Sequence, residues 1–276
     1  MSIPGPKILL MGPGGTGKTH SLGTLCDWAQ AHGKTMFVLG LDQGLEALFG
    51  YYTDRDLPIP PCLQWKWQIT KPLGLKQLSL AADQVAKFSY EAITKMLDPN
   101  RSDNNAFLKI LETCSKPVSD RDGKEFPSLD QWDSSMIFAV DGLSELSNAA
   151  MKMVIGSKPT ASMPDYGVAQ NNLMNFLRLC AQGSRYTFVM ISHVVKQKNE
   201  LTGAETIQIS TIGNAISSQI PPMFSDVIYT VREGDKFFWD TAAYGVETKT
   251  RSLGYRSKIP PDFSQIMDVW LKRGGE

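Results

Sequence analysis

The sequence has no surplus of charge of either sign, because its 276 residues carry 28 Lys and Arg against 28 Asp and Glu. Nucleic-acid binding usually leaves a basic excess, so the bulk charge gives no sign of it and any such site has to be a local patch. The length suits one large α/β domain, or one core domain that carries insertions. We therefore expect residues 1–276 to form a single domain.

Cysteine is scarce and scattered, and apolar runs are short. No two of the four cysteines, Cys26, Cys62, Cys114 and Cys180, have the spacing of a metal site. Three of them lie in apolar contexts, where buried free thiols in a reducing compartment are the simplest expectation. No apolar run is long enough to span a bilayer, and the first residues show neither the charged nor the apolar region of a signal peptide. From these absences we expect a soluble cytoplasmic protein without membrane contacts.

Short apolar runs that end at glycine or a polar residue recur along the chain and predict buried parallel strands. The first two, at residues 7–11 and 35–41, flank a helical pattern at 19–32, which makes a βαβ unit. Two more buried strands are expected at 136–140 and 186–191. Short strands joined by glycine-bearing turns follow at 227–231, 237–241 and 246–249, so we predict an antiparallel extension near the C-terminus.

The middle of the chain, residues 51–135, is less regular, and we interpret it as an elaboration of the core domain. Alternating apolar residues at 63–69 predict a half-buried strand, and helical spacing predicts a long helix at 75–96 and a shorter one at 106–114. The polar stretch at 116–135 is typical of a loop. The sequence assigns this elaboration no role.

The strongest functional signal is an unbroken G-x-x-x-x-G-K-T motif between a predicted strand and a predicted helix. Its glycines let successive backbone N–H groups point at phosphate oxygens, and the helix adds its positive end. Lys18 is expected to reach the β- and γ-phosphates, and the Thr19 hydroxyl to coordinate Mg²⁺. The sequence thus predicts a P-loop that holds ATP with Mg²⁺, with these binding residues: Gly12, Pro13, Gly14, Gly15, Thr16, Gly17, Lys18, Thr19 and His20.

Polar residues at the ends of two later strands complete the predicted site. Asp141 ends the strand at 136–140 and can hold the hydration shell of Mg²⁺, or alternatively cap the next helix. His193 follows the strand at 186–191 and can report the γ-phosphate, or be an ordinary structural histidine. For the group that activates water, spacing leaves three candidates open: Asp42, Glu46 and Glu145.

Two basic residues near the C-terminus, Lys249 and Arg251, occur at positions i and i+2 and would lie on one side of a strand. Supplied by a neighbouring subunit, such a pair could stabilise charge on a transferred phosphoryl group. A solvated basic edge is the ordinary alternative.

In order along the chain, GPGGTGKT, LDQGLEAL, IFAVDGLSEL, VMISHV, TIGNAISSQIPPMFSDVIY and ETKTRSLG resemble the RecA-type ATPase core. The closer resemblance is to phage-encoded RecA-like proteins of the single-strand-annealing and recombination kind. The first motif is shared by many P-loop families, whereas the later ones resemble this group more than adenylate-type kinases or AAA+ proteins. The resemblance implies a RecA-like α/β fold, with a mostly parallel sheet flanked by helices.

The resemblance also implies roles for the residues named above. Lys18 and Thr19 would bind phosphate and Mg²⁺, with Asp141 holding the metal through water as the Walker B carboxylate. His193 would sense the γ-phosphate, and the K-x-R pair formed by Lys249 and Arg251 would complete a neighbour's site. Asp42 stands where this group commonly has a catalytic Glu, so slow or switch-like hydrolysis is expected.

RecA-like proteins bind single-stranded DNA through two loops, and the resemblance places these loops at residues 156–167 and 194–219. The first offers Lys158 and Tyr166, and the second offers Lys196 and Lys198. Such residues can contact phosphates and stack on a base, although two plain surface loops would look alike.

We therefore expect an ATP-dependent recombination or annealing protein that binds single-stranded DNA. It would work in the host bacterial cytoplasm as a homo-oligomeric ring or filament, with a single-strand-binding protein left open as a further partner. The alternative is an ATPase switch or assembly factor that acts on a protein partner without DNA. Tyr51 and Tyr52 are suggested as contacts for the adenine base, without a motif that assigns them.

Overall fold

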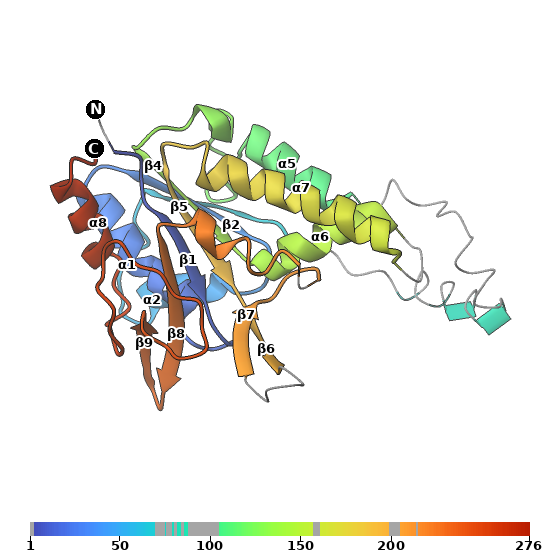
Figure 1. Cartoon of the computed structure of the whole chain (residues 1–276). Coiled ribbons are helices and arrows are strands. Elements are labelled where there is room, and N and C mark those ends of the chain that lie inside the picture. The colour runs from blue at the N-terminus through green and yellow to red at the C-terminus, as the bar shows by residue number, and fades with distance from the viewer. Residues whose placement is uncertain are drawn as a thin grey trace.

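In the described part of the chain, the main sheet lies between two layers of helices, and a separate two-stranded hairpin projects from it (Figure 1). The computed structural model describes residues 3–69, 105–156, 161–198, 205–213 and 215–276, with positions 75, 79, 82, 83, 86 and 87. The helix predicted at 75–96 falls almost wholly outside these residues, and so does Lys158.

Within the described residues, seven strands make the main sheet in the order β3-β2-β4-β5-β1-β8-β9. The first six run parallel, and β9 pairs antiparallel with β8. This is the RecA-like order, so the predicted fold class is confirmed, including the antiparallel extension. The strands are β1 Lys7–Met11, β2 Thr35–Gly40, β3 Leu63–Trp67, β4 Met136–Asp141, β5 Thr187–Ser192, β8 Asp226–Glu233 and β9 Lys236–Asp240.

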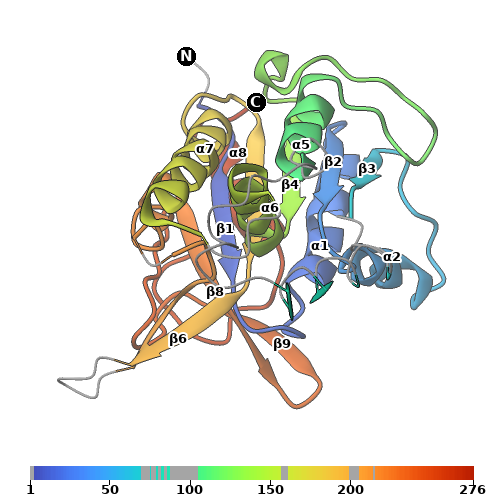
Figure 2. The same ribbon diagram turned by 90° about the vertical axis from the view of Figure 1, so that its right-hand side faces the viewer.

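Helices cover both faces of the sheet (Figures 1 and 2). One face packs against α1 Lys18–Ala31, α2 Leu45–Thr53 and α8 Ser264–Lys272, and the other against α5 Ala106–Ser115, α6 Leu143–Ile155 and α7 Met163–Ala181. Strand β1 therefore alternates between two cores, with Leu9 in the α5–α7 core and Ile8 and Leu10 in the other. Because both faces are buried, the central strands are continuous apolar runs, which is why they could be predicted.

The strand register brings the functional ends together. Met11 of β1 is level with Ser192 of β5, and Asp141 of β4 is level with Ile191 of β5 and with Gly40 of β2. The residues that leave the carboxyl ends of these four strands thus meet at one edge of the sheet, where ligands bind in open α/β folds.

Two predicted loops are corrected by the structure. Helix α7 begins at Met163, inside the loop expected at 156–167, because Ser162 and Asp165 form a capping box and Pro164 occupies the first turn. The loop expected at 194–219 contains an antiparallel hairpin, β6 Val194–Lys198 and β7 Glu205–Ile209. Short 3₁₀ turns occur at Leu129–Gln131 and Pro221–Met223.

The strand predicted at 246–249 is also wrong. Only two isolated bridges occur there, one between Val246 and Ile207 and one between Lys249 and Val227. Directly after the second bridge, the side chain of Asp226 accepts hydrogen bonds from the backbone N–H groups of Arg251 and Ser252, so these groups bond to a side chain and not to a strand.

The four cysteines are free thiols, as predicted. Two of them nevertheless come together, since the sulfur atoms of Cys26 and Cys62 lie 3.7 Å apart between α1 and the start of β3. Among the described helices, none has the length and apolar character needed to cross a bilayer.

Candidate nucleotide-binding site

The P-loop connects β1 to α1 with a backbone that glycine makes possible. Gly15 and Gly17 have φ values of 72° and 77°, a region that side chains rarely adopt. At Gly12, an added Cβ would lie 2.1 Å from the hydroxyl oxygen of Thr230, so no larger residue fits. Within the described residues, the backbone N–H groups of Gly14–Gly17 make no hydrogen bond of standard geometry. Free N–H groups at a helix N-terminus fit phosphate oxygens.

Lys18 is buried beneath this loop, with 5% of its surface exposed. Its ammonium donates to the carbonyl oxygens of Gly12, at 2.9 Å, and Pro13, at 2.7 Å. Burial lowers the pKa of Lys18 to about 8, although the carboxylates of Asp141 and Asp42 favour the charged form. An ammonium held by neutral carbonyls has the donors and the charge to bind phosphate.

Thr19 and Asp141 form the part of the site that suits Mg²⁺. The Thr19 hydroxyl donates to Oδ2 of Asp141 at 2.6 Å. Asp141 is 2% exposed, and burial, followed by the charge of Asp42, raises its pKa to about 7 despite Thr19 and Lys18. A hydroxyl beside a carboxylate is the oxygen set that a phosphate-bound Mg²⁺ ion uses, so these two residues fit the ion.

Asp42 faces the same point as Thr19 and Asp141. Its Oδ1 accepts a hydrogen bond of 2.7 Å from the N–H of Gly44. A Cβ added to Gly44 would lie 2.8 Å from Oδ1 of Asp42, 3.1 Å from Oδ2 of Asp141 and 3.3 Å from Oγ1 of Thr19. The three oxygen atoms therefore lie around the point where a side chain at position 44 would begin.

The other water-activating candidates lie differently. A Cβ added to Gly142 would lie 3.4 Å from Oδ2 of Asp42 and 3.8 Å from Cβ of Glu145, so Glu145 is next to Asp42. Glu46 is exposed on the first turn of α2. The order of proximity favours Asp42 as the group that activates water.

His193 follows β5 beside these groups, and its side chain is partly open to solvent. Partial burial and the charge of Lys18 lower its pKa, against the opposing carboxylates of Asp42 and Glu145. The residue before it, Ser192, accepts the N–H of Gly12 of the P-loop at its carbonyl oxygen, at 3.2 Å.

Lys249 and Arg251 lie at the other end of the sheet. Lys249 forms an isolated bridge with Val227 near the start of β8. Both residues line a pocket of about 360 Å³ together with Lys7 and Arg273. The Lys249 ammonium donates to the carbonyl oxygens of two residues in the preceding segment, Pro222 and Phe224. Within the described residues, no acceptor takes the guanidinium of Arg251. The pair is therefore remote from its own P-loop.

The two residues suggested as adenine contacts have protein partners in the structure. Tyr51 and Tyr52 are buried between α1 and α2, and both hydroxyl groups donate to the carboxylate of Asp27. His20, predicted to contact nucleotide, packs edge-on against Tyr51 and faces Phe237.

Sequence reasoning missed Phe237, whose ring borders the P-loop. A Cβ added to Gly17 would lie 2.7 Å from this ring, and the guanidinium of Arg232 lies over the ring, 5.9 Å from its centroid. The only signal was the predicted strand at 237–241, which did not reveal that the strand pairs with β8 and places Phe237 beside the P-loop.

The predicted DNA-binding residues are spread over separate elements. Tyr166 is half-buried in the first turn of α7, and Lys196 is exposed on β6, 3.9 Å from Glu205 across the hairpin. Lys198 ends β6 opposite Glu205 in the strand register. Two elements, α7 and β6, thus carry the three predicted positions that the structure describes.

Residues 4–255 match a protein family described as an AAA domain. The chain belongs to this AAA domain family. The match includes the P-loop, Asp42, Asp141 and His193, and together with the RecA-like strand order it makes the chain a P-loop ATPase. An ATPase domain implies nucleotide binding, usually with Mg²⁺.

Other comparisons add little to the AAA domain assignment. No curated protein matches the sequence. A solved structure of a prototypical ATPase from the type III secretion system of pathogenic bacteria is similar with a TM-score of 0.39 and 11% identity over 83% of this chain. This chain spans about half of that protein, 53% of its length, and a likeness at this level carries no argument about function.

Gly44→Ala tests the shared geometry of the three oxygens. The added methyl group would displace Asp42 or Asp141, and we expect kcat/KM for ATP to fall about tenfold or more, because misplaced catalytic groups lose rate steeply. Gly50→Ala in α2 is the matched control, since its Cβ would meet only Asp54, at 3.6 Å. Phosphate release measures both variants, and equal rates in the two would contradict the arrangement.

Proposed function

We propose that this chain is an ATP-driven protein of DNA recombination or annealing that binds single-stranded DNA. One observation carries the DNA part of the proposal. The β6–β7 hairpin begins directly after His193, and the carbonyl oxygen of His193 accepts a hydrogen bond of 2.8 Å from the N–H of Ser210, just after the hairpin. The projecting hairpin (Figure 1) is thus joined at its base to the residue that we propose as the sensor of the γ-phosphate.

The proposed hydrolysis uses the groups at the sheet edge. Lys18 and the P-loop N–H groups would hold the phosphates, and Thr19 and Asp141 would hold Mg²⁺, which would supply positive charge against the phosphate oxygens. Asp42 accepts a proton from water as the water oxygen bonds to the γ-phosphorus. The bond from that phosphorus to the bridging oxygen breaks, and ADP leaves with the electron pair, which gives ADP and phosphate.

The hairpin supplies the proposed link to DNA. His193 directly follows Ser192, whose carbonyl oxygen accepts the N–H of Gly12 in the P-loop, so the position of His193 can differ between the ATP and ADP states. The hydrogen bond to Ser210 would pass such a change to the base of β6 and β7. The exposed Lys196 on β6 is suited to a phosphate of the DNA backbone. Phe237, at the other side of the P-loop, is proposed as a contact for the base or ribose of ATP.

We also propose that Lys249 and Arg251 act on the nucleotide of a neighbouring subunit. Their place at the amino ends of the strands excludes contact with their own P-loop, and the pocket around them is lined by further cations, Lys7 and Arg273. Its one carboxylate, Asp226, is occupied by backbone N–H groups. An accessible guanidinium in such surroundings suits a phosphate group presented by a partner.

The test is ATP turnover with and without single-stranded DNA. We expect DNA to stimulate turnover, and Lys196→Ala to raise the DNA concentration needed about threefold or more, as loss of one phosphate contact does, without changing basal turnover. Lys116→Ala is the matched control, because both lysines are 73% exposed and lie 3.9–4.0 Å from a glutamate. The same assay with mixed Lys18→Ala and Arg251→Ala subunits would regain activity if Arg251 acts across the interface. An ATP turnover rate that does not change when DNA is added would instead favour an ATPase that acts on a protein partner.

A further inference from the structure

We propose that Trp67 is a positioning residue for Asp42, and that it gives the elaboration at 51–135 a role in hydrolysis. The indole N–H of Trp67 donates to the backbone carbonyl oxygen of Asp42 at 2.7 Å. This inference rests on the proposed hydrolysis, in which Asp42 takes the proton of the attacking water.

Asp42 lies on the turn after β2, and hydrogen bonds from both sides hold this turn. On the inner side, the N–H of Leu41 donates to the carbonyl oxygen of Asp141 at 2.7 Å. On the outer side, β3 is the edge strand, and Trp67 is its last residue, level with Gly40. The indole of Trp67 thus reaches past the end of β2 to the carbonyl of Asp42 and fixes the peptide that carries the carboxylate.

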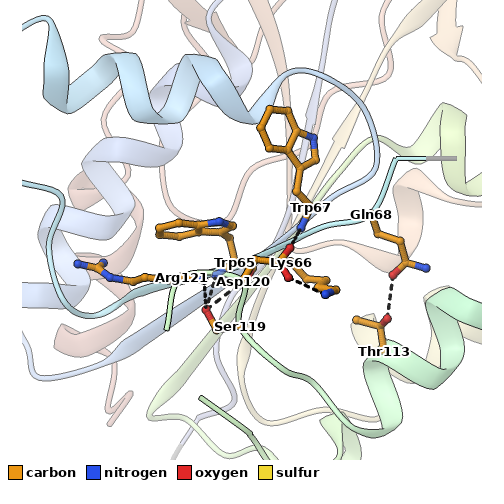
Figure 3. A network of polar contacts seen from close by, with 8 residues as sticks. All are labelled: Trp65, Lys66, Trp67, Gln68, Thr113, Ser119, Asp120 and Arg121. Atoms are coloured by element: carbon orange, nitrogen blue, oxygen red, sulfur yellow. Dashed lines mark hydrogen bonds and ion pairs between the residues drawn. The ribbon is translucent and has the colours of Figure 1, made fainter. Parts of the chain in front are cut away.

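Segments of the elaboration hold the end of β3 in place (Figure 3). The carboxylate of Asp120 accepts the backbone N–H of Trp67 at 2.8 Å and the ammonium of Lys66 at 2.6 Å, and the N–H of Asp120 donates to the carbonyl of Trp65 at 2.7 Å. The chain around Asp120 therefore pairs with the free edge of β3, which would otherwise expose unpaired backbone groups.

A second contact reaches the same turn from α5. The Thr113 hydroxyl donates to the side-chain oxygen of Gln68 at 2.8 Å (Figure 3), and the N–H of Gln68 donates to the carbonyl oxygen of Gly40 at 2.8 Å. Two successive residues, Trp67 and Gln68, thus bond to the segment from Gly40 to Asp42. The elaboration supports the water-activating carboxylate through side chains that do not themselves touch the nucleotide site.

Trp65 provides a matched control for Trp67. It is the preceding aromatic residue of the same face of β3, is half-buried like Trp67, and packs edge-on against Phe49, 4.9 Å away between centroids. Within the described residues, no acceptor takes its indole N–H. Replacement of either tryptophan by Phe keeps a ring, but only Trp67→Phe removes a hydrogen bond to the turn of Asp42.

The experiment compares Trp67→Phe and Trp65→Phe in steady-state turnover, binding of a fluorescent ATP analogue and melting temperature. We expect Trp67→Phe to lower kcat about tenfold, the equivalent of one hydrogen bond. Its KM, analogue affinity and melting temperature should match those of Trp65→Phe. In an Asp42→Asn background, Trp67→Phe should cost nothing further, since a positioning residue acts only through the group that it positions.

Each result is decisive. Equal kcat values for the two Phe variants, or the same loss from Trp67→Phe with and without Asp42, would overturn the positioning role while the ATPase proposal stands. An active Asp42→Asn protein would overturn it as well, because no base would remain to be positioned. A wild-type protein without turnover would overturn the proposed function and this inference together.

Discussion

Lys18→Ala is expected to lower kcat for ATP about 100-fold or more and to weaken nucleotide binding. The ammonium of Lys18 lies below the P-loop on the carbonyl oxygens of Gly12 and Pro13, where it can turn to the phosphates. Loss of one preorganised donor to developing charge typically costs about two to three orders of magnitude in rate. Phosphate release and binding of a fluorescent ATP analogue measure the two effects.

Lys34→Ala is the control for this substitution. Lys34 is also buried, and its ammonium also donates to two backbone carbonyl oxygens, those of Ser134 and Glu276. It follows the carboxyl end of α1, whereas Lys18 begins that helix. If both variants lost turnover equally, the loss would reflect damage to the fold, and the role of Lys18 would be refuted.

Asp42→Asn has the second large expected effect, a fall in kcat of about 100-fold or more with nucleotide binding retained. The amide keeps the shape of the side chain and can still accept the N–H of Gly44, but it cannot take a proton from water. Single-turnover hydrolysis measures the chemical step, and analogue binding shows that the site is intact.

The two remaining carboxylates provide the comparison. Glu46→Gln changes an exposed side chain and should leave turnover unchanged, whereas Glu145→Gln, beside Asp42, should have an intermediate effect. If Glu145→Gln stopped hydrolysis and Asp42→Asn did not, Glu145 would be the group that activates water.

The fold and the P-loop were predictable because their signals are local. A central strand such as β1 is a continuous apolar run, since helices bury both of its faces, and its range was predicted to the residue. The P-loop motif needs specific glycines at fixed spacing, two of which have positive φ values here. The positions of Asp141 and His193 at strand ends then followed from the parallel sheet.

The errors arose where weak local signals were overlooked or where contacts are distant in sequence. The sequence Ser162-Met-Pro-Asp165 is a capping box and marks the start of α7, but the prediction of a loop at 156–167 did not take it into account. The β6 and β7 strands are short and polar and resemble a loop. By contrast, no local pattern shows that the indole of Trp67 bonds to Asp42, because that contact depends on the register of β2 and β3.

The central claim is that Lys18, Thr19, Asp42 and Asp141 form one site for ATP and Mg²⁺. A crystal structure with a non-hydrolysable ATP analogue and Mg²⁺ tests it most directly. We predict that the phosphates lie on the P-loop and that the ammonium of Lys18 points to them. We predict Mg²⁺ beside the Thr19 hydroxyl and the Asp141 carboxylate, with Asp42 facing the terminal phosphate. Nucleotide bound elsewhere, or Mg²⁺ remote from Asp141, would contradict the account.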